Sequence, residues 1–320
     1  MNGAKSSSAT ATTGTVEARS PYRGRFAPSP SGALHFGSLV AAIASFLDAR
    51  AAGGQWLLRI EDLDPPRERP GAADQILHTL DRLGLHWDGP VLRQSSRGDA
   101  YAQALERLQR DGLVRPCRCS RAALAALPEN ARRAAGDDLF HPPDCLPGPA
   151  GDRSRPALRF RVPGTEVVFR DRVQGVVRVD VAATVGDFVL RRKDGLYAYQ
   201  LAVVVDDQQQ GITHVVRGAD LLHSTPRQIL LQGALGMHAV EYMHVPLVVD
   251  AGGLKLSKSS DAPGLAAASA TRQLVAALEF LGQEPPGVLK DATAVEALAW
   301  AVSNWHPERI AGVMAAAAPA

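Results

Sequence analysis

The sequence predicts an α/β protein with a Rossmann-like, doubly wound parallel sheet, an inserted subdomain and a short C-terminal helical region. Strand and helix patterns alternate between residues 22 and 112, which is typical of βαβ units and therefore of parallel strands. The alternation stops between residues 116 and 180, where cysteines, prolines and glycines gather, and it resumes near residue 187. We therefore expect two halves of one sheet on either side of an insertion.

The first half is expected to contain two strands and three helices. In chain order these are a strand ending at Arg25-Phe26, a helix over 39–50, a strand over 55–60, and helices over 72–83 and 99–111. Gly84 and Gly112 follow the last two helices at the position where a glycine commonly ends a helix. The sequence therefore predicts where these two helices end.

The insertion is expected to hold small antiparallel strands, because valine and arginine alternate in Val176-Val-Arg-Val179. Beyond it, the α/β pattern is expected to resume through segments at 187–190, 198–205, 212–216, 222–235 (a helix) and 245–249. An Ala-rich helical pattern fills 265–320, with Trp300 and Trp305 as expected packing anchors. The predicted divisions are a disordered tail (1–20), the two halves of the sheet domain (21–115 and 181–250), the insertion (116–180) and a loop with C-terminal helices (251–320).

Composition places the chain among ordinary globular proteins, with 320 residues, 46% hydrophobic and 21% charged side chains. A net charge of +2 neither indicates nor excludes a nucleic-acid partner, because such binding needs only a local basic patch. No apolar run approaches the roughly 20 residues of a membrane span, and residues 1–20 lack the apolar core of a secretory signal, leaving a transit peptide as the alternative to a disordered tail. Three cysteines do not suggest a disulfide framework, so we expect a soluble, cytoplasmic protein.

The most informative segment is Arg25-Phe-Ala-Pro-Ser-Pro-Ser-Gly-Ala-Leu-His-Phe-Gly-Ser38. It places His35, Gly37 and Ser38 where a strand turns into a helix, so that backbone N–H groups and the positive end of the helix can face a phosphate. Gly37 allows a nucleotide to approach the backbone closely. These residues are candidate ATP-binding residues.

A second segment, Lys255-Leu-Ser-Lys258, follows two glycines and holds two of the five lysines of the chain. Two ammonium groups on a glycine-rich loop suit the negative charge that develops on ATP as pyrophosphate leaves. The alternative is a solvated cluster of surface charge, which the presence of the first segment makes the weaker interpretation.

A candidate amino-acid site consists of Arg25, Glu61, Tyr199 and Arg217, each at or just beyond a predicted strand end, where open α/β sheets bind ligands. Two guanidinium groups suit the two carboxylates of an acidic amino acid, and Glu61 with the Tyr199 hydroxyl suits its ammonium group. The alternative is that the charges around Glu61 compensate one another in a solvated loop and that Tyr199 belongs to the core.

A candidate metal site consists of Cys117 and Cys119, followed by His141 and Cys145. Three thiolates and one imidazole at these spacings suit a four-coordinate structural zinc ion. Binding would supply folding free energy to a proline-rich segment that buries little apolar surface. Spacing alone leaves open that these are ordinary thiols and a surface histidine.

Five ordered segments resemble the catalytic domain of glutamyl-tRNA synthetases, which are class I aminoacyl-tRNA synthetases. They are Arg25–Gly32, Arg59–Arg67, Val203–Asp207, Val216–Leu221 and Lys255–Lys258, and the likeness runs from about residue 22 to 262. The chain is similar more narrowly to shortened paralogues that lack the anticodon-binding region, since only 62 residues follow Lys258.

The resemblance implies site residues as well. It assigns glutamate contacts to Arg25, Ala27, Ser29, Glu61, Tyr199 and Arg217. It gives His35 and Lys258 the catalytic roles on ATP, and it places a zinc ion at the cysteine cluster. The segment ends in Ser38 where most class I enzymes have a second histidine; the paralogues are similar in having serine, which leaves one donor fewer for phosphate.

The implied activity is ATP- and magnesium-dependent activation of L-glutamate without tRNA, and transfer of glutamate to queuosine in the anticodon of tRNA(Asp), by a monomer. Arg118, Arg121, Arg132 and Arg133 are candidate RNA phosphate contacts, or else a solvated face. Two alternatives are a minimal glutamyl-tRNA synthetase that charges the 3′ end of tRNA(Glu) and a non-catalytic tRNA-binding paralogue.

Overall fold

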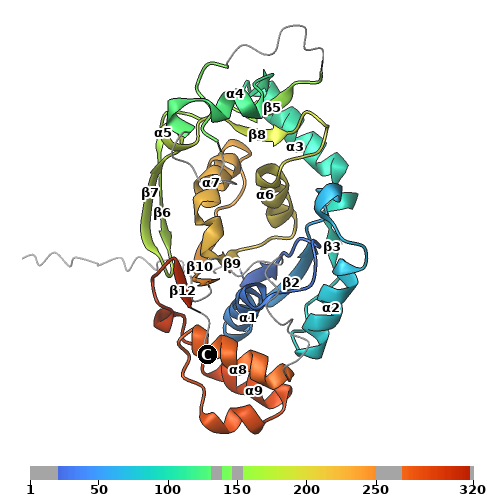
Figure 1. The fold of residues 1–320 in the computed structure, drawn as a ribbon, viewed down its shortest axis with the longest axis vertical. Helices are drawn as coiled ribbons and strands as arrows, with labels where there is room; N and C mark the ends of the chain where they lie inside the picture. Colours follow the sequence, from blue (N-terminus) through green and yellow to red (C-terminus); the bar gives the residue numbers. More distant parts are fainter. Residues whose placement is uncertain (1–20, 131–138, 146–153, 250–268, 318–320) are drawn as a thin grey trace, which may run out of the picture.

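The computed structural model describes residues 21–130, 139–145, 154–249 and 269–317. The expected N-terminal tail, Arg132, Arg133, and the lysine pair Lys255 and Lys258 lie outside these residues. The element order alternates strand and helix in the first half of the chain (Figure 1), as the sequence predicts.

A parallel sheet forms the centre of the fold. Its strands are β1 (Arg23–Phe26), β2 (Gln55–Ile60), β3 (Leu92–Arg93), β9 (His214–Gly218), β10 (Glu241–Val245) and β6 (Glu166–Asp171). β1 pairs with β2 and β2 with β3, while β9 pairs with β10 and β10 with β6, all in parallel. The two groups meet where the backbone N–H of Thr213 donates to the Arg23 carbonyl at 2.9 Å, so β1 has β2 on one side and the β9 segment on the other.

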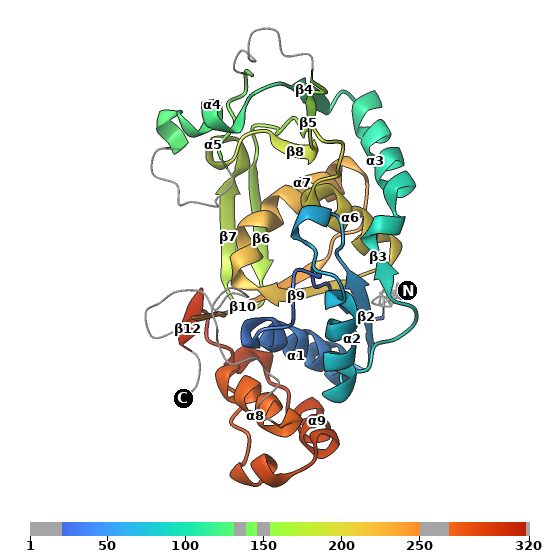
Figure 2. The same cartoon turned by 45° about the vertical axis from the view of Figure 1, so that its right-hand side comes forward.

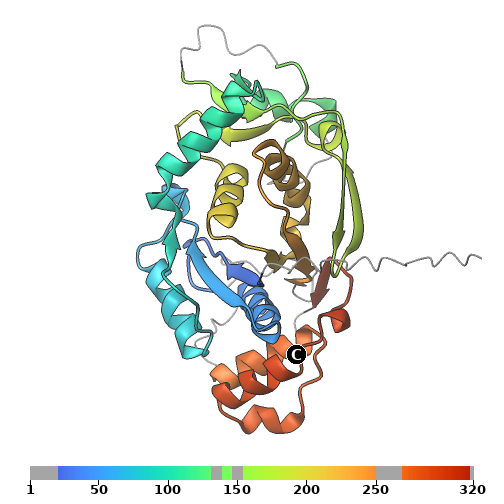
Figure 3. The same ribbon diagram turned by 180° about the vertical axis from the view of Figure 1, so that it is seen from behind.

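Helices cover the sheet on both sides. The helices of the first half are α1 (Phe36–Ala51), α2 (Ala72–Arg82) and α3 (Gly98–Arg110), and those of the second half are α6 (Tyr199–Gln209) and α7 (Thr225–Ala234). Figure 2 shows α1 on one side of β9 and β10, with α6 and α7 on the other. Seen from behind, α6 and α7 lie between α3 and the hairpin of β6 and β7 (Figure 3). The three helices of the first half lie where the sequence predicts them, over 39–50, 72–83 and 99–111.

Helix α1 is buried over most of its length because it lies between the sheet and the C-terminal helices. Residues 39, 40 and 42–49 are buried, including the polar Ser45 and Asp48. Asp48 accepts hydrogen bonds from Tyr22, Arg172 and Trp305, with the Trp305 indole N–H at 3.0 Å. This contact confirms Trp305 as a packing anchor of the C-terminal region.

The insertion contains a second, antiparallel sheet. β4 (Val114–Cys117), β5 (Ala157–Phe160) and β8 (Phe188–Arg191) pair in the order β4-β5-β8, and β6 forms an antiparallel hairpin with β7 (Gly175–Asp180). The expected antiparallel strand around Val176–Val179 is confirmed. The expectation that the parallel pattern resumes at 187–190 is wrong, because β8 pairs antiparallel with β5. The short helices α4 (Arg121–Ala125) and α5 (Val181–Thr184) complete this region.

The C-terminal region is helical, as predicted, with one strand that was not expected. α8 (Ala270–Phe280) and α9 (Ala294–Ser303) pack against α1. The Thr293 hydroxyl and the Glu296 carboxylate cap the start of α9. The short strand β12 (Ala315–Ala317) pairs in parallel with β11 (Leu247–Val249). Among the described residues, no helix combines the length and the apolarity that crossing a lipid bilayer requires.

Candidate functional site

The candidate amino-acid site lies where the strand order of the sheet reverses. The chain runs outward from β1 to β2 and β3 and later returns to the other side of β1 as β9. Ligands of open α/β sheets bind at the carboxyl ends of the strands at such a point. Arg25 lies near the end of β1, Glu61 directly follows β2, and Arg217 lies near the end of β9. Tyr199 was expected at a strand end and is instead the first residue of helix α6.

Arg25 is held by a buried carboxylate. Its Nε donates to Asp207 Oδ1 at 3.2 Å, and Arg59 Nη1 donates to the same oxygen at 2.8 Å. Burial alone would raise the pKa of Asp207, but the guanidinium groups of Arg25 and Arg59 outweigh it and lower the pKa. Within the described part of the chain, the two terminal nitrogens of Arg25 make no hydrogen bond. They form the two-pronged donor that a carboxylate ligand would accept.

Arg217 is more fully engaged than the sequence suggests. Its Nε donates to His244 Nε2 at 3.0 Å, and its Nη2 donates to Thr225 and Gln228 at 2.8 Å each. Its Nη1 donates to the Tyr199 hydroxyl at 3.2 Å. Of the five N–H groups of the guanidinium, the described residues accept four, which leaves one on Nη1 for a ligand. Arg217 therefore offers a single donor, which is next to the Tyr199 hydroxyl.

Glu61 completes the charge pattern of the site. Arg59 Nη2 lies 3.4 Å from Glu61 Oε1. Burial raises the pKa of Glu61 in spite of the nearby Arg59 and Arg25. Burial raises the pKa of the Tyr199 hydroxyl. The nearby Arg217 and Arg25 guanidinium groups oppose this rise, and the Glu61 carboxylate adds to it. Two cationic donors, a phenol and a carboxylate acceptor thus lie at one end of the sheet, as the sequence predicts.

A buried histidine and carboxylate support Arg217 from behind. His244 Nδ1 lies 2.6 Å from Asp171 Oδ2, and both side chains are fully buried. Because Arg217 donates to Nε2, the imidazole proton must be on Nδ1, where it is donated to Asp171. Burial, reinforced by the Arg217 guanidinium, lowers the pKa of His244 to about 4 in spite of the bond to Asp171. A neutral imidazole can therefore accept from Arg217 across the physiological range.

This lowered pKa predicts a pH-dependent stability. Above pH 6.5 the imidazole is neutral in the folded and the unfolded chain, so it contributes no slope. Between pH 6.5 and about 4 only the unfolded chain binds the proton, and the free energy of unfolding should fall by up to about 3 kcal/mol as the pH drops. Denaturant unfolding of the wild type and of His244→Gln gives the free energy of unfolding at each pH. Over this window the slopes of that free energy against pH should differ by an amount that corresponds to the uptake of up to one proton on unfolding. Equal slopes would contradict the assignment.

The candidate phosphate site begins helix α1. His35 is its N-cap residue, and the Ser38 backbone N–H donates to His35 Nδ1 at 3.2 Å. A Cβ atom on Gly37 would lie 3.2 Å from the His35 ring, so a larger residue there would press on the imidazole. His35, Gly37 and Ser38 are thus neighbours in space at the start of α1, and their role in phosphate binding stays a prediction.

The loop between β1 and α1 carries the other predicted glutamate contacts. The Glu61 backbone N–H donates to the Pro28 carbonyl at 3.0 Å, which holds this loop against the end of β2. Ala27 and Ser29 flank Pro28 and therefore lie beside Glu61. Lys255 and Lys258 lie outside the described residues, so their roles stay predictions.

The predicted metal ligands come together in the insertion. One ligand atom of each of Cys117, Cys119, His141 and Cys145 lies within 4.8 Å of every other. His141 Nε2 faces the sulfur atoms, at 3.2 Å from Cys117 Sγ and 3.9 Å from Cys145 Sγ. Only a glycine fits at position 186, because the Cβ atom of any other residue there would lie 1.8 Å from the His141 carbonyl oxygen.

The charge state of the cluster fits a cation. Burial would raise the pKa of Cys117, but hydrogen bonds from His141 and the Cys119 backbone lower it to about 5. Burial and the adjacent Cys117 thiolate raise the pKa of Cys145 to about 11. Cys145 therefore keeps its proton at neutral pH unless a positive charge lies beside the Cys117 thiolate. Three sulfurs and one imidazole nitrogen are a donor set that zinc prefers.

Four further residues of the site had no role in the sequence prediction. They are Arg59 and Asp207, which hold Arg25 and Glu61, and Asp171 and His244, which support Arg217. A signal existed for Asp207, since two aspartates, Asp206 and Asp207, follow the apolar run Val203–Val205 and stand out as candidate buried charges. No local signal existed for Asp171 and His244, which are 73 residues apart in the sequence.

Comparison with known proteins gives consistent findings. Residues 22–268 match the family described as the catalytic domain of class I tRNA synthetases (E and Q). A glutamyl-Q tRNA(Asp) synthetase of Pseudomonas aeruginosa is 56% identical over 292 residues, which cover 91% of this chain and 96% of that protein. One from Dechloromonas aromatica is 56% identical over 288 residues, covering 89% and 94%.

A solved structure is similar over nearly the whole chain. It is a crystal structure of a glutamate tRNA ligase from Elizabethkingia meningosepticum in complex with its amino acid, with a TM-score of 0.75 and 25% sequence identity. The likeness covers 94% of this chain and 67% of that one.

Proposed function

Because the chain belongs to the class I (E and Q) tRNA synthetase family, we propose that it activates L-glutamate with ATP and transfers the glutamyl group to queuosine in tRNA(Asp). The class of enzyme follows from the family: the chain is a class I aminoacyl-tRNA synthetase-like ligase. The amino acid, the independence of activation from tRNA and the acceptor are the proposed parts.

The choice of glutamate is supported by the charges at the end of the sheet. Arg25 presents two free terminal nitrogens, which suit one carboxylate of the substrate. The Tyr199 hydroxyl accepts from Arg217, so its own proton can be donated to a ligand, and one Arg217 N–H lies beside it. Glu61 provides the carboxylate that the substrate ammonium group needs. A zwitterion with one additional negative charge complements these four side chains.

Activation needs positioning and charge neutralisation rather than a covalent intermediate on the enzyme. An oxygen of the glutamate α-carboxylate attacks the α-phosphorus of ATP, the bond to the β-phosphate oxygen breaks, and pyrophosphate leaves. We assign to His35, Gly37, Ser38 and the start of α1 the binding of the phosphates, and to Lys255 and Lys258 the charge that develops on pyrophosphate. Magnesium accompanies ATP in this proposal.

Transfer completes the reaction. The oxygen of an acceptor hydroxyl attacks the carbonyl carbon of glutamyl-adenylate, the bond to the AMP phosphate breaks, and the hydroxyl proton passes to solvent. The acceptor is proposed from the relatives, since proteins named glutamyl-Q tRNA(Asp) synthetase are matched by this chain over 94–96% of their length. We further propose that the cysteine and histidine cluster binds one structural zinc ion.

Removal of the 3′-terminal adenosine from tRNA(Asp) tests the acceptor. Queuosine lies in the anticodon, so trimmed tRNA(Asp) should accept radiolabelled glutamate as well as intact tRNA does. Intact and trimmed tRNA(Glu) are the matched comparison, and neither should be labelled. A product that disappears on trimming, or that forms on intact tRNA(Glu), would make the enzyme a minimal glutamyl-tRNA synthetase instead.

A further inference from the structure

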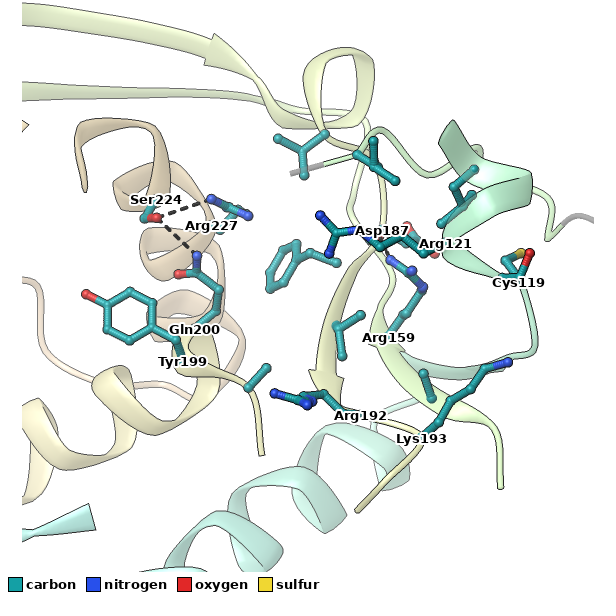
Figure 4. A pocket seen from close by; sticks show the side chains of 18 residues that line it. Cys119, Arg121, Arg159, Asp187, Arg192, Lys193, Tyr199, Gln200, Ser224 and Arg227 are labelled. Atoms are coloured by element: carbon teal, nitrogen blue, oxygen red, sulfur yellow. Dashed lines mark hydrogen bonds between the residues drawn. The ribbon is translucent and has the colours of Figure 1, made fainter. Parts of the chain in front are cut away.

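The guanidinium of Arg217 is held from two directions, and the first of them is the helical side. Its Nη2 donates to Gln228 Oε1 at 2.8 Å, and Gln228 Nε2 donates to Gln200 Oε1 at 3.0 Å. Gln200 donates in turn to the Ser224 hydroxyl, which also accepts from Arg227 (Figure 4). These contacts tie the Nη2 side of the guanidinium to helices α6 and α7.

The Nε side of the guanidinium depends on a turn of the insertion. Asp171 ends strand β6, and its Oδ1 accepts from the backbone N–H groups of Val173, Gln174 and His244, at 3.0, 2.8 and 3.2 Å. Its Oδ2 lies 2.6 Å from His244 Nδ1. The two carboxylate oxygens therefore have different partners, since Oδ1 serves backbone donors and Oδ2 serves the imidazole.

This division of partners sets the direction in which the imidazole of His244 donates. A carboxylate oxygen only accepts, so the ring proton lies on Nδ1, and Nε2 accepts from Arg217 Nε at 3.0 Å. The side chains are almost closed to solvent, with Asp171 1%, His244 0% and Arg217 5% exposed. The opposite tautomer would place two N–H groups head to head in this buried position, which is costly.

We propose that Asp171 and His244 are positioning residues for the binding of glutamate: Asp171 fixes the tautomer of the imidazole, and the imidazole aims the guanidinium of Arg217 at a substrate carboxylate. Asp171 acts through His244 and His244 acts through Arg217, so neither is assigned a contact with the substrate. The insertion, residues 116–180, thus supplies a residue on which amino-acid binding depends. The proposal rests on the proposed function, because it requires that Arg217 contacts glutamate.

Replacing Asp171 with asparagine tests the fixed tautomer. The asparagine must keep its oxygen against the three backbone N–H groups, so its NH₂ group faces the imidazole. Nδ1 then becomes the acceptor and the ring proton moves to Nε2, against the Arg217 Nε–H. In pyrophosphate exchange we expect KM for glutamate to rise about ten- to hundredfold, the scale of one hydrogen bond to a charged group. KM for ATP and kcat should each change by less than about threefold, because the lost contact binds the amino acid in the ground state.

Two variants of His244 separate the two contacts of the ring. In His244→Gln the side-chain oxygen can take the place of Nε2 and accept from Arg217. In His244→Asn the side-chain nitrogen can take the place of Nδ1 and donate to Asp171, but no acceptor then faces Arg217. We expect His244→Gln to keep KM for glutamate within about threefold of the wild type and His244→Asn to raise it as much as Asp171→Asn does.

Nuclear magnetic resonance of protein labelled with nitrogen-15 histidine reads the tautomer directly. The wild type should carry the His244 ring proton on Nδ1, and Asp171→Asn should carry it on Nε2. The matched control is Gln174→Ala, which loosens the same turn by removing the donations of Gln174 Nε2 to the carbonyls of His244 and Val313, at 3.0 and 3.1 Å. It should change neither the tautomer nor KM for glutamate.

The outcomes separate this proposal from the proposed function. If the wild type shows no glutamate-dependent exchange, with or without tRNA(Asp), the proposed function fails. If the wild type exchanges and Asp171→Asn keeps the proton on Nδ1, or keeps the wild-type KM for glutamate, only the positioning proposal fails. An equal rise of KM in His244→Gln and His244→Asn, or in Gln174→Ala and Asp171→Asn, would also overturn it, because loosened packing would then explain the loss. Should Asp171→Asn not fold, the two His244 variants decide the matter.

Discussion

Replacing Arg25 with glutamine is expected to lower kcat/KM for glutamate in pyrophosphate exchange by about 10²–10³-fold. The variant loses both terminal guanidinium nitrogens, which we propose bind a substrate carboxylate, and it leaves the buried carboxylate of Asp207 with one fewer cationic partner. Removing one partner of a buried, hydrogen-bonded charge pair weakens ligand binding by about 2–5 kcal/mol, and each 1.4 kcal/mol corresponds to a factor of ten. The assay contains no tRNA, and the wild type should exchange under these conditions.

The control for this prediction is Arg23→Gln on the same strand. Arg23 donates to Gln55 Oε1 and to the Gln210 carbonyl at the far end of β1, so its loss should change kcat/KM by less than about threefold. Arg25→Lys should recover only part of the activity, since an ammonium group cannot present two parallel donors to a carboxylate. Wild-type exchange by Arg25→Gln would remove Arg25 from the amino-acid site.

Replacing Cys119 with serine is expected to remove the metal completely. Freshly purified wild type, prepared without chelator, should contain one zinc ion per chain by elemental analysis, and the variant should contain none. Structural zinc sites supply on the order of 10 kcal/mol of folding free energy, so the segment around Cys117, Cys119 and His141 should become protease-sensitive in the variant. Glutamate activation should survive in part, because Arg25 and Arg217 are on other elements.

Asp144→Asn provides the control for the zinc prediction. Asp144 is exposed and adjacent to Cys145, but it is not one of the four clustered ligands, so its replacement should leave the zinc content unchanged. Wild-type protein without zinc would refute the metal assignment. Equal loss of zinc from Asp144→Asn and Cys119→Ser would show that the metal is held differently.

The sequence predicts local structure well where the chain carries its own signals. Helix α1 was expected over 39–50 and extends from Phe36, because His35 caps it with its ring. β2 covers 55–60 as predicted, although its burial does not alternate along the strand. β8 was misassigned because a short apolar run does not reveal whether its partner is parallel or antiparallel. Tyr199 was misplaced for a related reason, since a short apolar run fits a buried helix as well as a strand.

The charged residues of the candidate site could be predicted from the sequence. The buried residues that hold them in place could not. Arg25, Glu61 and Arg217 follow from strand ends, which can be read from the sequence. Asp171 and His244 meet only because β6 pairs with β10, and that pairing depends on the tertiary fold.

The central claim is that glutamate is attached to queuosine, and one comparison tests it most directly. Purified enzyme is incubated with ATP, magnesium and radiolabelled glutamate, and with tRNA(Asp) prepared either with or without queuosine. We expect label on the queuosine-containing tRNA and none above background on the other, with the label recovered in the anticodon fragment after nuclease digestion. Equal labelling of both tRNAs, or recovery of the label at the 3′ end, would contradict it.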